Sequence, residues 1–268
     1  MIPRFVLDPL FRRVLRPPLR KPRALPPDLA THAEDVTISG PRPMKAWHLK
    51  PEGIPRGTAV FVHGWSSDGG RMAPLARPLL RAGIACLLVD LPGHGRTGPI
   101  EAYHAAFMVE DLRAVADHLD GARAALLGYS FGGIGAIVSA ATDPRWRALV
   151  VLATAEGPME ATEVYLEGKG IPARWFRRTL HRSARRLVGV DPDAFRGSGH
   201  LPTIKIPVLF VHGTMDEVVP FAHAQRLHAS APAGTAELVL VEGAGHDALL
   251  THAGAGESIA AFLAHVTF

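Results

Sequence analysis

The stretch Gly128-Tyr129-Ser130-Phe131-Gly132-Gly133 joins two segments of different pattern. The apolar run Ala122 to Leu127 predicts a buried strand, and the small and apolar residues from Ile134 to Ala141 predict the start of a helix. A strand that turns directly into a helix strains the residue at the apex, and glycines two positions before and after it avoid a collision of side chains. This G-x-S-x-G pattern therefore predicts that the Ser130 hydroxyl is held out of the backbone at the carboxyl end of a strand.

Length and composition indicate a globular α/β protein. The chain has 268 residues, of which 47 % are hydrophobic, so it can bury a substantial core and is not disordered. The single cysteine, Cys86, excludes an intramolecular disulfide and lies in the apolar run Ile84 to Val89, where a core residue is expected. No apolar stretch reaches the roughly 18 residues of a membrane helix, so we expect a cytoplasmic protein.

Residues 1–35 form a basic arm that is rich in arginine and proline. Its apolar residues recur at helical spacing over residues 5–15 and predict a short amphipathic helix. Two interpretations remain open: peripheral membrane contact through residues 1–25, or packing on the chain's own domain or on a second subunit. We favour packing because the helix is short and prolines follow it closely.

The rest of the chain alternates between predicted strands and helices. Residues 36–38 and 44–48 predict an antiparallel hairpin, and helices are expected over residues 71–82, 102–119 and 259–266. Buried strands are expected at residues 59–62 and 147–153, and further strands at residues 84–89, 207–211 and 236–241. This alternation predicts an α/β fold with a mostly parallel central sheet flanked by helices.

Residues 157–203 interrupt the alternation and predict a small helical lid, here called the lid segment. A helix is expected over residues 172–188, with an apolar stripe at Phe176, Leu180, Ala184 and Leu187. Its remaining positions are crowded by Arg174, Arg177, Arg178, Arg182, Arg185 and Arg186. These arginines either attract an anionic substrate or a membrane, or form a solvated face, which we favour. The expected core is then residues 36–156 and 204–268.

Two later loops supply an acid and a base. Asp216 follows the predicted strand 207–211, and His246 lies between a glycine-rich turn and the last helix. The chain order Ser130, Asp216, His246 is the one expected of hydrolases with this architecture. Three other acids could in principle take the place of Asp216 beside His246. Glu217 is expected to point elsewhere and Asp247 to structure its own loop, whereas Glu156 is a minor alternative. His63 and His94 are expected to fix loops by hydrogen bonds.

The turn His63-Gly64-Trp65 follows a central strand at the edge of the sheet where ligands bind. A tetrahedral oxyanion needs two hydrogen-bond donors. The backbone N–H groups of Trp65 and Phe131 are the expected pair. Glycine at position 64 allows the loop backbone to approach a substrate closely.

Five motifs together resemble the α/β-hydrolase superfamily over residues 36–268. They are Val62-His63-Gly64-Trp65, Val89-Asp90-Leu91-Pro92-Gly93-His94-Gly95, the serine turn, Gly213-Thr214-Met215-Asp216 and Gly245-His246. The chain is similar to lid-bearing serine hydrolases with a His-Gly-x oxyanion loop. Two departures exist: Tyr129 stands where the family often has histidine, and the first 35 residues have no counterpart in the minimal fold.

The resemblance implies acyl transfer through catalytic Ser130, Asp216 and His246 and an acyl-enzyme intermediate. The expected protein is a serine hydrolase that cleaves a carboxylic ester or thioester of a small-molecule acyl substrate. The alternatives are an amide- or peptide-cleaving, aminopeptidase-like hydrolase and a hydrolase-fold protein that only binds. No cofactor motif or metal-ligand spacing is present, and the dispersed basic residues do not favour nucleic-acid binding.

Overall fold

The computed structural model describes residues 4–121 and 123–268. Residues 1–3 of the predicted arm and Ala122, the first residue of a predicted strand, lie outside the described residues.

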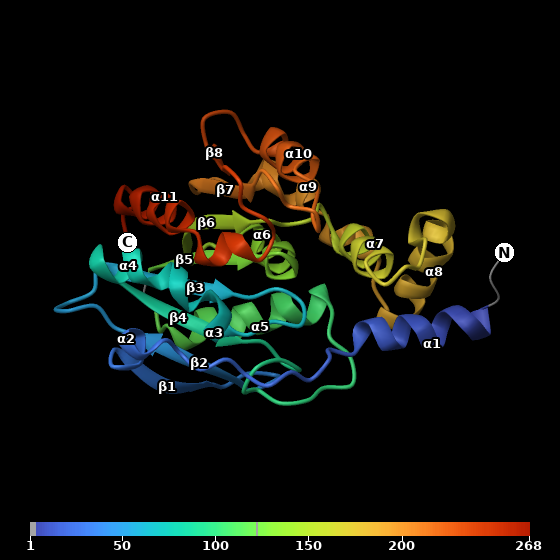
Figure 1. The fold of residues 1–268 in the computed structure, drawn as a ribbon, viewed down its shortest axis with the longest axis horizontal. Coiled ribbons are helices and arrows are strands. Elements are labelled where there is room, and N and C mark those ends of the chain that lie inside the picture. The colour runs from blue at the N-terminus through green and yellow to red at the C-terminus, as the bar shows by residue number, and fades with distance from the viewer. Residues whose placement is uncertain (1–3, 122) are drawn as a thin grey trace.

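An eight-stranded sheet forms the centre of the molecule, in the order β1-β2-β4-β3-β5-β6-β7-β8 (Figure 1). β1 and β2 pair antiparallel, β2 pairs antiparallel with β4, and the remaining pairs are parallel. The strands are β1 (Ala33–Ile38), β2 (Met44–Leu49), β3 (Gly57–Val62), β4 (Ile84–Asp90), β5 (Ala124–Tyr129), β6 (Trp146–Leu152), β7 (Val208–Gly213) and β8 (Ala236–Val241). The predicted hairpin and the mostly parallel α/β sheet are confirmed.

Helices cover both faces of the sheet (Figure 1). α3 (Gly69–Met72), α4 (Ala76–Arg81) and α11 (Ala253–Ala264) pack on one face, where Leu79 and Ile259 join the buried core. α5 (Ala105–His118), α6 (Phe131–Thr142) and α10 (Ala222–Ser230) pack on the other, where Leu112 and Ile137 are buried. Both faces of β3 to β7 are thus buried, which explains their continuous apolar runs, whereas the edge strand β8 is only partly buried.

The helix predicted over residues 71–82 is divided. It consists of α3, the short 3-10 helix η1 (Ala73–Leu75) and α4, because Pro74 and Pro78 remove backbone donors from a continuous helix. The last helix begins at Ala253, six residues before the predicted 259, after the short 3-10 helix η5 (Ala248–Thr251). Its extra turns are rich in alanine and glycine and carry little periodic signal.

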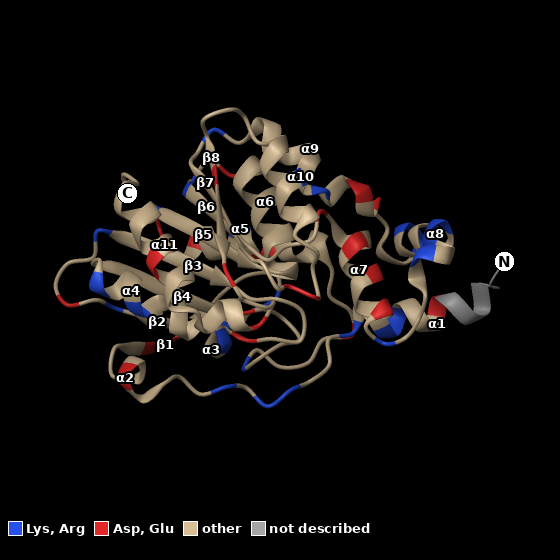
Figure 2. Ribbon diagram, turned by 45° about the horizontal axis from the view of Figure 1, so that its top comes forward, with Lys and Arg blue, Asp and Glu red and all other residues tan. Residues whose placement is uncertain are grey.

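The lid segment lies between β6 and β7. It comprises α7 (Pro158–Glu167), η2 (Ala173–Phe176), α8 (Arg177–Val188), η3 (Pro192–Phe195), α9 (Gly197–His200) and η4 (Leu201–Thr203). The single helix predicted over residues 172–188 was therefore wrong at its start, since the chain makes a 3-10 turn before α8. Leu180 and Ala184 of the predicted stripe are buried, and several arginines on the other side of α8 are exposed (Figure 2).

Near the N-terminus, α1 (Arg4–Leu15) and the short α2 (Pro27–Ala30) precede the sheet. α1 packs against the lid segment at the end of the molecule far from α2 (Figure 1). Phe11 is only 3 % exposed and belongs to a small apolar cluster with Met159, Leu180 and Ala184. The apolar side of α1 therefore contacts the chain's own domain. Within the described ranges, no helix has the length and apolar character needed to cross a membrane.

Candidate active site

Strand pairing brings two loops together at the carboxyl edge of the sheet. Val62 of β3 pairs with Gly128 of β5, so the turn after Val62 and Ser130 lie side by side. Ser130 has a φ of 53°, a strained conformation for a residue with a side chain. A Cβ on Gly128 would lie 2.5 Å from the Gly133 Cα, and one on Gly132 would overlap the Val62 carbonyl oxygen. Both glycines are therefore required by close packing.

A hydrogen-bonded chain links the three residues that the sequence singles out. The Ser130 hydroxyl lies 3.0 Å from His246 Nε2, to which it donates, and the His246 Nδ1–H donates to Asp216 Oδ2 over 2.8 Å. The side chains of His246 and Asp216 are 10 % and 1 % exposed. This is the arrangement in which a histidine accepts a proton from serine while a carboxylate orients the ring.

Backbone groups fix the Asp216 carboxylate. Its Oδ1 accepts hydrogen bonds from the N–H groups of Val218 and Val219, at 2.9 and 2.7 Å. His212 lies 3.5 Å from Oδ2, but its Nε2–H donates to the Val219 carbonyl oxygen at 2.9 Å. Burial lowers the pKa of His212, which keeps this ring neutral beside the carboxylate. Asp216 is thus left free to pair with His246.

The expected oxyanion donors lie on both sides of Ser130. A Cβ on Gly64 would come 3.0 Å from the Ser130 Cβ, which shows how closely the loop before Trp65 approaches the serine. The rings of Trp65 and Phe131 meet edge to face with centroids 5.3 Å apart. Phe131 begins α6, so its N–H belongs to the unpaired first turn. Among the described residues, no acceptor pairs with the Trp65 N–H.

The two histidines expected to fix loops do so. His63 is fully buried, where its Nε2 accepts from the Leu91 N–H at 3.0 Å and its Nδ1–H donates to the Gly64 carbonyl oxygen at 2.8 Å. His94 Nδ1 lies 3.0 Å from the Pro92 carbonyl oxygen. Burial lowers the pKa of His63 to about 4 and that of His94 to about 3, so both rings are neutral at pH 7.

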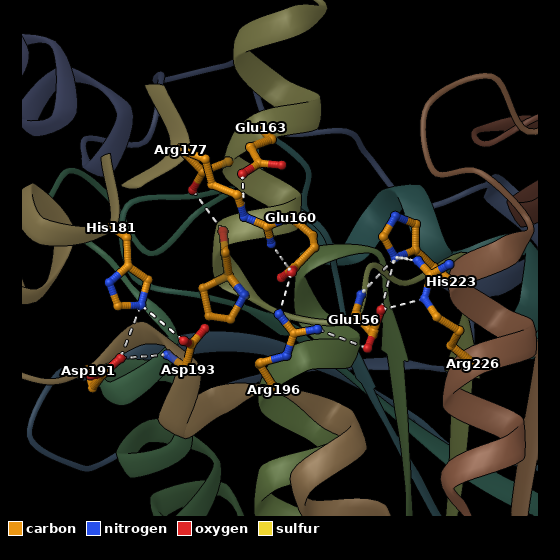
Figure 3. Close-up of polar contacts among 12 residues, drawn as sticks. Glu156, Glu160, Glu163, Arg177, His181, Asp191, Asp193, Arg196, His223 and Arg226 are labelled. Carbon is orange, nitrogen blue, oxygen red and sulfur yellow. Dashed lines mark hydrogen bonds and ion pairs between the residues drawn. The ribbon is translucent and has the colours of Figure 1, made fainter. Parts of the chain in front are cut away.

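Among the described residues, none of the competing acids forms a hydrogen bond with the His246 ring. Glu217 is exposed to solvent. Glu156 is held by Arg196 at 3.0 Å and by Arg226 at 2.6 Å (Figure 3). Asp247 accepts from the Tyr129 hydroxyl at 2.9 Å and pairs with Arg71.

Tyr129 is a feature of the site that sequence reasoning treated only as a departure from the family. Its hydroxyl contacts Asp247 and lies 3.3 Å from the His246 carbonyl oxygen. Its ring centroid lies 5.0 Å from that of His246. The residue before Ser130 therefore supports the loop that carries the histidine. The sequence does show a tyrosine next to Ser130 and an acid next to His246. These neighbours predict a hydrogen bond only once the two loops are known to meet.

A cavity of about 400 Å³ opens beside Ser130. Trp65, Phe131 and His246 line it, as the sequence predicts for groups that meet a substrate, whereas Asp216 lies behind His246. The lid segment supplies much of the remaining wall. Apolar side chains of α1 also line the cavity, which the sequence analysis did not anticipate. They are Phe11, Val14 and Leu15.

A chain of ion pairs holds the lid segment to the core (Figure 3). Arg196 contacts Glu156 at 3.0 Å and Glu160 at 2.5 Å, which joins the two ends of the segment. Arg177 of α8 pairs with Glu160 and with Glu163, the latter at 2.9 Å. The one described cluster of metal-ligand atoms also lies in the lid segment, where His181 Nε2 is 3.2 Å from Asp191 Oδ1 and 3.1 Å from Asp193 Oδ2.

Comparisons with known proteins agree with this geometry. The model of the alpha/beta hydrolase family matches residues 59–256. A pimeloyl-[acyl-carrier protein] methyl ester esterase from Xylella fastidiosa is 28 % identical over 235 residues, covering 72 % of this chain and 89 % of that protein. The polyketide synthase ThaQ of Burkholderia thailandensis is 31 % identical over 252 residues, covering 76 % of this chain and 12 % of the synthase.

Among solved structures, an esterase from Pyrococcus furiosus superposes with a TM-score of 0.73 at 18 % identity, covering 94 % of this chain and 99 % of that one. This likeness concerns the fold. The family match spans most of the sheet and all three residues of the hydrogen-bonded chain. The chain belongs to the alpha/beta hydrolase family.

Proposed function

We propose that the protein is a serine esterase that cleaves carboxylic esters or thioesters through an acyl-enzyme on Ser130. The hydrogen-bonded chain from Ser130 through His246 to Asp216, at a strained turn beside an apolar cavity, carries this proposal. The pimeloyl-[acyl-carrier protein] methyl ester esterase to which the chain is similar supports ester cleavage.

In the first half of the reaction, the Ser130 Oγ attacks the carbonyl carbon and His246 Nε2 takes the hydroxyl proton. Asp216 holds the other ring nitrogen and stabilises the imidazolium. The carbonyl oxygen becomes an oxyanion and accepts from the N–H groups of Trp65 and Phe131. Each donor lowers the barrier by roughly 3 kcal/mol. His246 then gives its proton to the departing alcohol or thiol.

The second half repeats these roles with water. His246 removes a proton from water, which attacks the acyl carbon of the Ser130 ester. The oxyanion forms and collapses again, the acid is released, and Ser130 recovers its proton from His246. The chain's own residues therefore supply every group that this hydrolysis requires.

We propose separate roles for the core and the lid segment. Residues 36–156 and 204–268 would hold the reacting groups, and residues 157–203 would cover them as a lid. The support for this division is that α7 and α8 line the cavity but contribute none of the three hydrogen-bonded residues. The substrate is a small-molecule acyl compound whose acyl group enters beneath the lid segment.

The test is hydrolysis of p-nitrophenyl esters from acetate to dodecanoate, with matched acyl thioesters and p-nitroanilides, by wild type and Ser130→Ala. We expect ester or thioester turnover that is lost in the variant, and fluorophosphonate labelling of wild type alone. Ser258→Ala, on the exposed side of α11, is the matched control. Turnover of anilides only would establish the amide-cleaving alternative, and a protein without turnover or label would be a binding protein.

A further inference from the structure

Helix α1 lies outside the region that the family model matches, which begins at residue 59. It nevertheless shares one apolar cluster with α7 and α8 (Figure 1). Phe11 is buried in this cluster, and Val14 and Leu15 pack at its border. The same three side chains line the cavity beside Ser130. A segment with no counterpart in the minimal fold thus forms part of the candidate active site.

Polar contacts fasten α1 in its second turn and at its end. In the second turn, Asp8 accepts from the Ser183 hydroxyl at 3.1 Å and pairs with Arg186, both on α8. At its end, the Leu15 carbonyl oxygen accepts from the Tyr103 N–H at 2.7 Å. Tyr103 is fully buried in the core. Helix α1 is therefore docked on both the lid segment and the core.

The chain that follows α1 continues this docking. A Cβ on Gly93 would lie 2.6 Å from the Pro17 Cγ, so the Pro17 ring packs closely on the Gly93 backbone. Gly93 precedes His94, whose ring meets that of Trp65 edge to face at 5.3 Å. A continuous set of packed groups thus runs from the end of α1 to the expected oxyanion loop, which gives α1 a defined position relative to the reacting atoms.

The cavity walls favour an aliphatic ligand. Apolar side chains make up most of their surface, among them the aromatic Trp65 and Phe131, and the charged Arg20, Arg71 and Lys169 also line the cavity. Val14 and Leu15 add branched aliphatic surface with no polar atoms. A polar chain placed against such walls would lose its hydrogen bonds to water without replacement, whereas each buried methylene is favourable.

We propose that α1 is a wall of the acyl-binding pocket, and that Val14 and Leu15 limit the length of the linear aliphatic acyl group that it accepts. The inference rests on the proposed esterase function. It assigns to α1 a role in substrate selection that the core motifs alone do not provide.

The experiment compares kcat/KM for p-nitrophenyl acetate and dodecanoate in wild type, Leu15→Trp and Val14→Trp. A larger side chain fills the pocket at α1, so the dodecanoate-to-acetate ratio should fall about 10-fold or more, the effect of excluding two methylenes. Acetate hydrolysis by the same variant is the reference for this ratio. Arg13→Ala, on the exposed side of α1, is the matched control and should keep the wild-type ratio.

Leu15→Ala and Val14→Ala guard against misfolding of the tryptophan variants. They enlarge the pocket and should shift the preferred chain length upward, while circular dichroism shows an unchanged fold. An unchanged ratio in all four variants would refute the role of α1.

A second readout does not depend on catalysis. Ser130→Ala should bind dodecanoate by calorimetry, and adding Leu15→Trp should weaken binding about 10-fold or more. If esters are not cleaved but binding is weakened, the esterase function is refuted and the role of α1 as a pocket wall is supported. If esters are cleaved but the variants change neither the ratio nor the binding, only the role of α1 is refuted.

Discussion

The carboxyl edge of the sheet, where Ser130, Asp216 and His246 meet and catalysis is proposed, is here called the catalytic edge. It and the lid segment are held by different forces. At the edge, backbone groups fix the side chains: Ser130 is fixed by a strained turn and Asp216 by two N–H donors. In the lid segment, side chains hold one another, as Arg196 shows by bridging Glu156 and Glu160. Positions at the edge are therefore set by the backbone, and positions in the lid segment by pairs of side chains.

The two regions also differ in the size of their buried apolar clusters. Large buried clusters lie on both faces of the sheet beneath the catalytic edge. The lid segment shares only a small cluster with α1, centred on Phe11, Met159 and Leu180. Since burial of apolar surface supplies most of the stability of a fold, the lid segment should open at lower free energy than the sheet. The five predictions below test this contrast.

Asp216→Asn should have the largest effect. The amide would hold His246 in the wrong tautomer, and kcat should fall roughly 10⁴-fold while the fold persists. Steady-state kinetics with a short ester measures this. Glu217→Gln is the control, because the neighbouring acid is exposed and should leave kcat unchanged. Equal losses in both variants would mean that Asp216 is not the orienting acid.

Acid should weaken the catalytic edge through His63. Because burial lowers its folded-state pKa from the usual value near 6.5 to about 4, the unfolded chain binds a proton that the folded chain does not. The contribution of neutral His63 is fully present above pH 6.5 and is lost as the pH falls to about 4, an effect of about 3 kcal/mol. Urea unfolding from pH 7 to 4 measures it. His63→Gln, which can still accept from the Leu91 N–H, should lose correspondingly less stability; equal acid losses would contradict this account.

Glu156 in the lid network should behave differently from His63. Burial raises its pKa, but the bonds from Arg226 and Arg196 outweigh burial and hold the pKa below its usual range. Its stabilising pairs are present above that range and are lost only as the pH falls through the lowered value. On acidification, the catalytic edge should therefore weaken before this anchor does.

Arg196→Met should loosen the lid segment without unfolding the sheet. Removing the bridge between its two ends should cost about 1–2 kcal/mol, because Arg196 is partly exposed. Hydrogen exchange should accelerate in residues 157–203 and remain unchanged in β5 and β6. Arg178→Met is the matched control, since this exposed arginine has no ion pair among the described residues. Faster exchange in the sheet would remove the distinction between the two regions.

Tyr129→Phe should have the smallest effect. Loss of the hydroxyl bonds to Asp247 and the His246 carbonyl would cost about 1 kcal/mol, which corresponds to a decrease in kcat of roughly 5-fold. KM for acetate should not change. Asp247→Asn keeps an acceptor for Tyr129 and should have a lesser effect. A wild-type kcat in Tyr129→Phe would show that the histidine loop is held without this tyrosine.

Much of the fold and site could be predicted from local sequence. The continuous apolar runs predicted the inner parallel strands because both faces of β3 to β7 are buried. The ends of the helices were harder to place. Pro74 divided one helix, and the alanines and glycines after residue 253 extended another with little periodic signal. In the lid segment, α7 and α9 were missed because partners from other elements stabilise these short helices.

The sequence by itself predicted the candidate reacting residues and their order. The glycines around Ser130, the acid after β7 and the histidine after β8 are set by turn geometry, which acts over a few neighbouring residues. Only the tertiary structure decided which distant groups meet: Tyr129 with Asp247, Arg196 with Glu156, and α1 with the cavity. Such contacts depend on packing between segments far apart in the chain, and no local pattern specifies the partner.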